Sequence, residues 1–217
     1  MQIEEILIRC NTSLPLPEIT VVSGASRRTF FTTPGDLRRV LLENLHEAIP
    51  ELVYLPPGLL YTDLQTTAVW WRPPTIQRIA VEFTARKAEI LPVPLPGLLM
   101  NINADGERMV CAIKGSTRPQ PDDPIWYAPL PNLNTSHRVC AAGGDQEKLA
   151  VAGLFDEQSL WEIYWESTFT AHSVTGKSHR YPDDIRLLLA EIAGQSEFPE
   201  ADLKPANDSV AMFAGIK

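Results

Sequence analysis

The stretch that decides the fold class is residues 98–113, which reads LLMNINADGERMVCAI. Two apolar runs, 98–102 and 109–113, flank the tetrapeptide Asn-Ala-Asp-Gly at 103–106. Asparagine, aspartate and glycine are the residues that tight turns favour, so the stretch predicts a β-hairpin. Strands joined by so short a turn run antiparallel, because parallel strands need a long crossover connection.

Further strand patterns surround this hairpin, and no helical period is visible from residue 51 to about residue 135. The apolar runs 68–71 and 78–83 are typical of strands, and prolines at 73–74 and in 94–97 separate them from their neighbours. Because the strands follow one another directly instead of alternating with helices, the sequence predicts an α+β fold with an antiparallel sheet meander.

Three helices are predicted around the strands. The first spans 34–48, with Thr33 as cap, proline at its first position and Pro50 as its stop. The other two are expected at about 155–170 and 182–193, the last ending before Gly194. Their apolar side chains recur every three to four residues, so we expect these helices to pack on one face of the sheet.

The two ends of the chain differ in pattern. Residues 1–32 alternate apolar and polar side chains like strands, whereas 196–217 are mostly polar and contain Pro199 and Pro205. We therefore expect one domain over 1–195, in which 1–32 is an N-terminal strand extension, followed by a flexible tail at 196–217.

Composition excludes several classes of protein. The 217 residues are 44% hydrophobic but contain no apolar run of 18 residues, which argues against a membrane span. The net charge of −8 argues against a nucleic-acid surface. Three cysteines without CxxC spacing favour neither a disulfide framework nor a structural zinc site, and no metal or cofactor is expected. The N-terminus lacks the basic and apolar regions of a signal peptide, so the expected location is the cytoplasm.

Cys140 differs from the other two cysteines in its surroundings. Cys10 and Cys111 lie within apolar strand patterns and are expected to be buried. Prolines precede Cys140 and small residues follow it, so its sulfur is expected to be approachable by a reactant. It is the candidate nucleophile; the alternative is an ordinary free thiol near a loop.

Asn132, with Pro131 before it, precedes Cys140 by eight residues, and the aliphatic Val139 stands directly before the cysteine. This segment resembles the active-site segment of ubiquitin-conjugating enzymes. The resemblance implies the ubiquitin-conjugating fold and a thioester of a ubiquitin-like protein on Cys140. It also implies that Asn132 supports the loop and stabilises the oxyanion.

Several short motifs resemble more narrowly the bacterial conjugating-enzyme relatives of the PRTRC system, its protein B. They are WWRPP at 70–74, LPN at 130–132, VC at 139–140 and STFTAH at 167–172. The resemblance covers most of the chain. It implies a ThiF-type activating enzyme and a ubiquitin-like protein as partners, with a JAB-class metallopeptidase in the same system.

The chain departs from the usual conjugating-enzyme segment at three places. Leu130 replaces the usual histidine, His137 the usual glycine, and two alanines follow Cys140 in place of Leu-Asp. His137 lies three residues before the cysteine and can either relay a proton or be a solvated loop residue. His172 follows a predicted helix, where a cation is favourable for structural reasons, but it too can reach the cysteine.

Three functions stay open at this point. The leading hypothesis is a transferase that passes a ubiquitin-like protein from Cys140 to an amine or hydroxyl acceptor. The second is a non-catalytic module of the same fold that binds a ubiquitin-like protein. The third is a cysteine hydrolase with Cys140 as nucleophile and His172 as base.

Overall fold

The structure, a computed structural model, describes residues 5–9, 18–23, 26–31, 56–63, 65–85, 87–140 and 145–216. The chain divides into two compact units, Met1–Tyr54 and Leu55–Lys217. The domain expected over 1–195 crosses this division and stays a prediction. The helix expected at 34–48 and Cys10 lie outside the described residues.

The first unit contains a three-stranded antiparallel sheet. Its strands are β1 (Glu5–Arg9), β2 (Glu18–Ser23) and β3 (Ser26–Phe31), in that order. Ile6 pairs with Val21, and Ile8 pairs with Ile19. The strand pattern of the first thirty residues is therefore confirmed.

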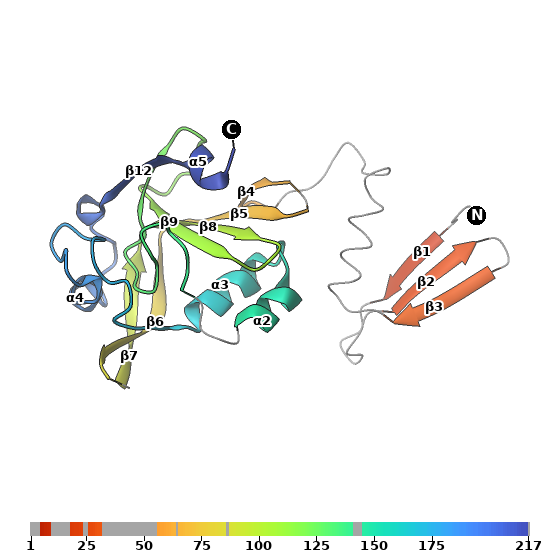
Figure 1. Ribbon diagram of the computed structural model, residues 1–217, viewed down its shortest axis with the longest axis horizontal. Helices are drawn as coiled ribbons and strands as arrows, with labels where there is room; N and C mark the ends of the chain where they lie inside the picture. The colour runs from red at the N-terminus through yellow and green to blue at the C-terminus, as the bar shows by residue number, and fades with distance from the viewer. Residues whose placement is uncertain are drawn as a thin grey trace. The chain divides into compact units, whose positions relative to one another are not determined.

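The second unit is built on a six-stranded antiparallel sheet (Figure 1). Its order is β12-β10-β9-β8-β5-β4, and the strands are β4 (Leu59–Thr62), β5 (Thr67–Arg72), β8 (Gly97–Asn103), β9 (Arg108–Ile113), β10 (Pro124–Tyr127) and β12 (Pro205–Ser209). The predicted hairpin is β8–β9, in which Met100 pairs with Val110. Its expected turn is present at residues 104–105.

A smaller sheet consists of β11 (Thr168–Phe169), β6 (Thr75–Thr84) and β7 (Lys87–Leu95). β6 extends the predicted strand at 78–83, and β11 runs parallel to it. The sequence analysis missed β7, which contains Pro92 and Pro94. Both prolines are tolerated because β7 is an edge strand of this sheet, where a missing N–H costs little.

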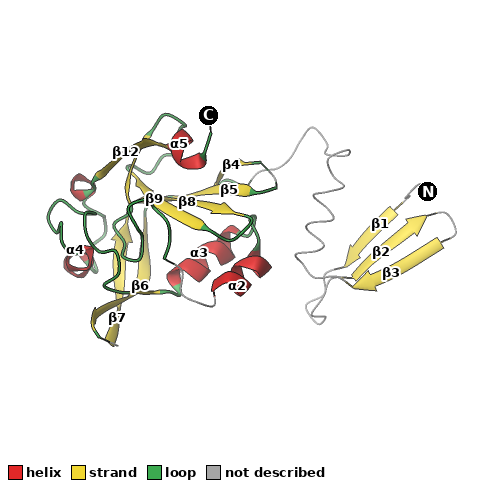
Figure 2. Cartoon of the chain, in the orientation of Figure 1, coloured by secondary structure: helices red, strands yellow, loops and turns green. Residues whose placement is uncertain are grey.

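Helices α2 (Asp145–Ala152) and α3 (Glu157–Trp165) lie side by side, and α4 (Ile185–Ile192) packs on β7 (Figures 1 and 2). The helix expected at about 155–170 ends earlier, at Trp165, because the chain enters β11 at Thr168. α4 begins after Asp184, whose carboxylate accepts the Arg186 N–H. α2 was missed because it has little apolar face: among its described side chains, only that of Leu149 is buried.

Both faces of the six-stranded sheet are covered, as the alternation along its strands requires. Trp70 and Met100 point into the main core with α3 and α4, whereas Leu99 and Cys111 point into a second core. The second core is closed by α5 (Val210–Ala214), which contributes Val210, Phe213 and Ala214. The predicted helices α3 and α4 thus pack on one face, as expected, and the opposite face is covered by α5, which the sequence analysis did not predict.

The expectation of a flexible tail at 196–217 is wrong. This segment forms a short 3-10 helix, η1 (Glu200–Asp202), then β12, which pairs with β10, and then α5. Most residues of this segment are polar, so the sequence pattern did not indicate that the short apolar run in α5 closes the second core. The C-terminal segment is thus part of the fold, an α+β fold with antiparallel sheets, as predicted.

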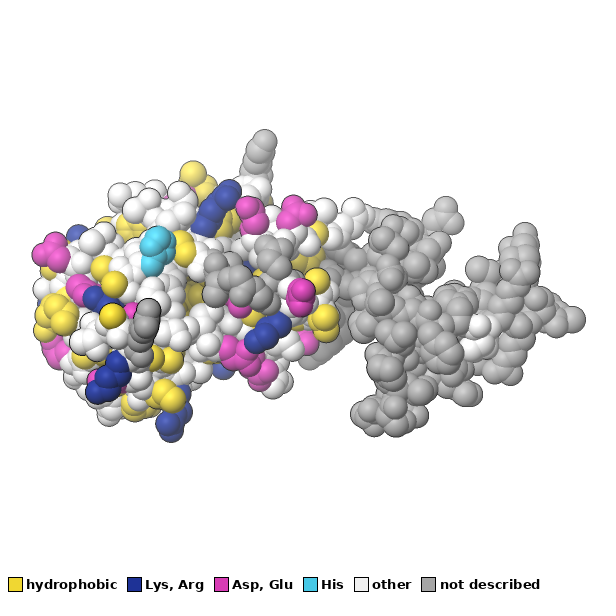
Figure 3. All heavy atoms as spheres, turned by 60° about the horizontal axis from the view of Figure 1, so that its bottom comes forward, with side chains coloured by type: hydrophobic (Ala, Val, Ile, Leu, Met, Phe, Trp, Pro, Cys, Tyr) yellow, Lys and Arg dark blue, Asp and Glu magenta, His cyan; other side chains and the backbone are white. Residues whose placement is uncertain are grey.

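In the part of the chain that the structure describes, no helix is long and apolar enough to cross a membrane. Acidic and basic side chains are interspersed on the face shown in Figure 3, so the net charge of −8 is not gathered into one patch there.

Candidate functional site

Cys140 ends a short hairpin that begins at Asn132. The Cys140 N–H donates to the Asn132 carbonyl at 2.8 Å, and Leu133 and Val139 form an antiparallel bridge one residue further in. The Asn134 N–H donates to the Arg138 carbonyl at 3.0 Å and closes the turn. The eight-residue spacing therefore makes Asn132 and Cys140 neighbours across the hairpin.

His137 occupies the turn of this hairpin with φ at 64°, in the left-handed region that favours glycine. Glycine usually occupies this position in the ubiquitin-conjugating-enzyme segment that the sequence resembles. The His137 ring stacks on Tyr127 at 5.1 Å between centroids and meets Phe213 edge-on at 5.8 Å. Burial lowers the pKa of His137, and the nearby charge of Asp208 opposes this shift. The ring is thus packed among aromatic side chains.

Asn132 also has a left-handed backbone, with φ at 58°, and its amide is bound on both sides. Nδ2 donates to the Thr168 carbonyl at 2.9 Å, while Oδ1 accepts the Thr170 hydroxyl at 3.0 Å and the Thr170 N–H at 3.3 Å. Asparagine tolerates such a backbone better than most residues, which explains its place here. The side chain ties the Cys140 hairpin to β11.

His172 contributes to the same brace through its backbone. Its carbonyl accepts the Asn132 N–H at 2.8 Å, and its own N–H donates to the Thr170 hydroxyl at 3.3 Å. The residue is exposed. Within the described residues, no hydrogen bond or ion pair joins the imidazole of His137 or of His172 to Cys140.

Arg108 fastens the hairpin to β9 and to α2. Its carbonyl accepts the Val139 N–H at 2.8 Å, and its guanidinium Nη2 donates to Asp145 at 2.7 Å. The side chain is almost fully buried, and its Nη1 has no partner in the described part of the chain. A buried, partly unpaired guanidinium is costly, and the backbone of the same residue holds Val139, which directly precedes the candidate nucleophile.

The two described cysteines have different environments. Cys111 is fully buried in the second core, and burial raises the pKa of its thiol. Cys140 is half-buried and free. Since reaction requires access as well as the thiolate, Cys140 is the better nucleophile.

Two buried polar side chains are influenced by the charge of Cys140, and the sequence analysis missed both. Lys177 is 4% exposed, and its Nζ donates to the Leu130 carbonyl. Burial lowers the pKa of Lys177 to about 7, and the charge of Cys140 opposes the shift. Tyr164 is 1% exposed, and its hydroxyl has no partner among the described residues. Burial raises the pKa of Tyr164, with the charge of Arg108 lowering it and that of Cys140 raising it further.

The sequence patterns around Tyr164 and Lys177 give no indication of a functional role. Tyr164 lies on the aromatic face of α3, where it packs against Trp165 and Phe169, so core packing accounts for its position in the pattern. Lys177 lies in the loop before α4, with no motif around it. Only the three-dimensional contacts identify them.

In the described ranges, no group of three or more His, Cys, Asp or Glu side chains is arranged to hold a metal ion. The reactive group available at this place is the half-buried free thiol of Cys140.

A family model described as prokaryotic E2 family D matches residues 36–206, which include Asn132, Cys140, Tyr164 and Lys177. E2 is the field's name for ubiquitin-conjugating enzymes. No curated protein and no solved structure matches the chain.

Proposed function

The chain belongs to prokaryotic E2 family D, and we propose that it carries a ubiquitin-like protein as a thioester on Cys140. The observation that supports this proposal best is the accessible thiol at the end of the hairpin 132–140, with Asn132 directly across from it. The family supports conjugation of a ubiquitin-like protein in general, and the cysteine is the group that this chain offers for it.

In the proposed reaction the Cys140 thiolate attacks the activated C-terminal carbonyl that an activating enzyme presents. A C–S bond forms, and the leaving group departs from the carbonyl carbon. An acceptor amine or hydroxyl then attacks the thioester, loses its proton, and releases the Cys140 thiolate. A thiolate suits both steps because it is a good nucleophile and a good leaving group.

For Asn132 the hydrogen bonds support a brace more strongly than an oxyanion donor. Its Nδ2 and Oδ1 are bound to Thr168 and Thr170, so the amide already holds the hairpin against β11. We propose that Asn132 fixes the position of Cys140. For His137 the ring stack on Tyr127 supports a packing role.

We extend the proposal to the partners that the motifs at 70–74, 130–132 and 167–172 imply. A ThiF-type activating enzyme would load Cys140 in the cytoplasm, and a JAB-class metallopeptidase of the same PRTRC-type system would process the ubiquitin-like protein. Genes for these proteins beside the gene for this chain would support the subgroup.

The test is a loading assay with the activating enzyme, the ubiquitin-like protein and ATP. The expected product is an adduct that a thiol reductant removes, absent from Cys140→Ala and stable to reductant as an oxyester in Cys140→Ser. Cys111→Ala is the matched control and should load normally, because its sulfur is buried.

Two outcomes would contradict the proposal. Binding of the ubiquitin-like protein without any adduct would identify a non-catalytic module, and cleavage of a conjugate without ATP would identify a hydrolase. A folded wild-type protein that never forms the Cys140 adduct excludes transfer through this residue.

A further inference from the structure

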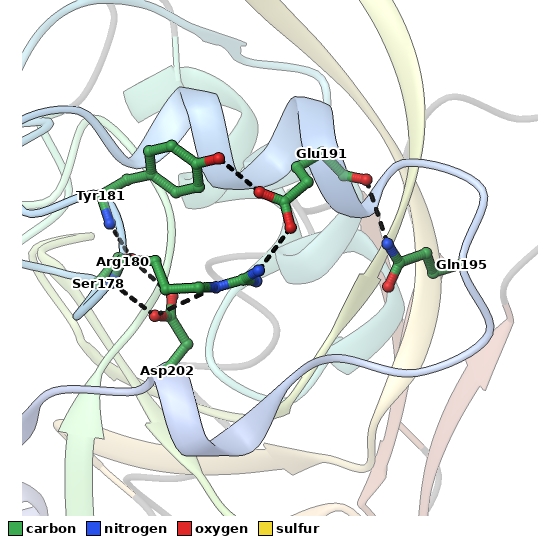
Figure 4. Close-up of polar contacts among 6 residues, drawn as sticks. All are labelled: Ser178, Arg180, Tyr181, Glu191, Gln195 and Asp202. Atoms are coloured by element: carbon green, nitrogen blue, oxygen red, sulfur yellow. Dashed lines mark hydrogen bonds and ion pairs between the residues drawn. The ribbon is translucent and has the colours of Figure 1, made fainter.

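The C-terminal segment from η1 to α5, residues 200–214, is held at both ends. At its start, the buried carboxylate of Asp202 accepts a hydroxyl and a backbone N–H from the loop 178–180, at 2.5 Å and 2.8 Å (Figure 4). At its end, the buried side-chain amide of Asn101 in β8 donates to the Phe213 carbonyl at 2.8 Å. The position of Phe213 is therefore fixed through its backbone as well as by packing in the second core.

The ring of Phe213 connects this segment to the Cys140 hairpin. It lies edge-on to the His137 ring at 5.8 Å between centroids, and Tyr127 of β10 stacks on the same imidazole at 5.1 Å. Phe213 is 5% exposed and is the one aromatic residue of α5. The imidazole thus contacts one ring from the six-stranded sheet and one ring from the C-terminal segment, both within the distance range of favourable aromatic pairs.

The backbone of His137 needs such support. Its φ of 64° is unfavourable for a residue with a β-carbon, and a conformation of this kind persists only where the surrounding structure holds it. The His137 carbonyl accepts the Val110 N–H at 2.8 Å, and the His137 N–H donates to the Asn134 carbonyl at 3.0 Å. The conformation at this turn directs residues 138–140 along β9, and so decides where the chain places Cys140.

Resting on the proposed function, we infer that Phe213 is a positioning residue: through His137, the C-terminal segment holds Cys140 in the geometry that transfer requires. Without the Phe213 ring the strained turn loses one of its restraints and can relax to other conformations. The sulfur would still react with a small reagent that approaches from any direction. It would react more slowly with a carbonyl that a large protein partner presents in one orientation, since a displacement of about 1 Å can cost on the order of 10²-fold in rate.

The base of the hairpin is held separately from its turn. The side-chain amide of Asn132 forms its hydrogen bonds with residues 168–170, outside the C-terminal segment. A change at Phe213 should therefore loosen the turn and leave the base in place. The Val110 N–H, which donates to the His137 carbonyl, reports on the turn, and the Cys140 N–H, which donates to the Asn132 carbonyl, reports on the base.

The test compares Phe213→Leu with Val210→Ala in the purified full chain. Val210 is as buried as Phe213 in the same core, so both substitutions remove apolar volume there, but only the first removes the ring that touches His137. Hydrogen exchange of the Val110 N–H, followed by NMR, should be about tenfold faster in Phe213→Leu than in Val210→Ala, and exchange of the Cys140 N–H should differ by less than about twofold.

The same two variants are compared in the loading assay. Thioester formation at saturating activating enzyme should be about tenfold slower in Phe213→Leu than in Val210→Ala. Alkylation of Cys140 by iodoacetamide should differ by less than about twofold, because a small reagent does not require one orientation of the sulfur. Wild-type loading and wild-type exchange in folded Phe213→Leu would overturn the inference.

A double-mutant cycle tests whether Phe213 acts through His137. In the His137→Gly background the left-handed turn needs no support from a side chain, because glycine adopts this backbone freely. Adding Phe213→Leu should therefore slow loading by less than about twofold in that background, compared with about tenfold in the wild-type background. An equal loss in both backgrounds would show that Phe213 does not act through this turn, and would overturn the inference.

If Phe213→Leu does not fold, the contact is removed from the other side. His137→Ala loses the ring and keeps the strained backbone, whereas His137→Gly loses both the ring and the strain. His137→Ala should load about tenfold more slowly than His137→Gly. Equal loading rates in these two variants would show that the conformation of the turn does not position Cys140.

The proposed function and this inference fail separately. If exchange at Val110 is faster in Phe213→Leu while the wild-type protein forms no thioester, the transferase assignment is wrong and the support of the hairpin by the C-terminal segment stands. If the thioester forms in Phe213→Leu at the wild-type rate, the transferase assignment stands and Phe213 does not position Cys140.

Discussion

The segment 130–140 and the loop that carries Lys177 meet at the Leu130 carbonyl, and they are held in different ways. The hairpin 132–140 is local: its register, its turn and the pairing of Asn132 with Cys140 follow from residues within nine positions of one another. The loop that carries Lys177 is held by Asp202, 25 positions away in the chain, and by Glu191 of α4. A local hairpin can be predicted from spacing, whereas a site assembled from distant segments depends on the whole fold.

The strongest test of this comparison removes the distant support. Asp202→Ala leaves the Ser178 hydroxyl and the Arg180 N–H without their acceptor, and we expect the free energy of unfolding to fall by about 3 kcal/mol. Urea denaturation measures this loss, and Asp183→Ala, which removes an exposed carboxylate, is the control. If the two variants unfold at the same urea concentration, the loop does not depend on Asp202.

Substitution of Asn132 tests how strongly the hairpin 132–140 is held in place. Asn132→Ala removes the bonds to Thr168 and Thr170 and puts alanine at φ 58°, so we expect a loss of about 2 kcal/mol. As a brace, Asn132 affects loading and discharge together. As an oxyanion donor, it would instead leave stability and loading intact and slow discharge on the order of 10²-fold.

Thermal melting and single-turnover discharge on Asn132→Ala separate these outcomes, and Asn132→Gly isolates the backbone contribution because glycine accepts the same φ. A variant with wild-type melting and wild-type discharge would show that Asn132 serves neither role.

Much of the fold followed from the sequence, and the errors have physical causes. The β8–β9 hairpin, β5, β6, α3 and α4 were predicted because alternation and caps are local signals. The C-terminal segment was misjudged because burial of Phe213 and Asp202 arises from contacts with strands and loops far away in the chain. For the same reason Lys177 could not be found: an isolated lysine in a loop gives no sign that it will be buried.

The next prediction concerns Tyr164, where we expect a substitution to increase the free energy of unfolding, by a smaller amount than the losses predicted above. Its hydroxyl is buried and has no partner among the described residues, so Tyr164→Phe removes the cost of an unsatisfied donor and keeps the ring contacts with Trp165 and Phe169. We expect the free energy of unfolding to rise by about 1 kcal/mol. Tyr181→Phe, whose hydroxyl donates to Glu191, is the matched control and should not stabilise the protein. A destabilised Tyr164→Phe would mean that the hydroxyl has a partner, such as an ordered water.

The smallest effect is expected at His137, where two contributions nearly cancel. His137→Gly relieves a left-handed backbone, worth about 1 kcal/mol, but loses the ring contacts with Tyr127 and Phe213, worth about 1 kcal/mol each at most. The net loss should be about half a kcal/mol. His137→Ala loses the rings and keeps the strained backbone, so it should be less stable than His137→Gly.

The pH dependence of stability separates a packed His137 from a solvated one. Its pKa is lowered by burial below the ordinary value of 6.5, so near that pH the unfolded chain binds more protons at this residue than the folded chain does. The contribution of neutral His137 to stability is therefore present above pH 6.5 and is lost as the pH falls through and below that value. Urea denaturation at pH 7.5 and pH 5.5 should show a smaller difference for His137→Gly than for wild type. Equal pH dependence in the two proteins would place this ring in solvent, as the sequence alone allowed, and would argue against its contact with Phe213 of the second core.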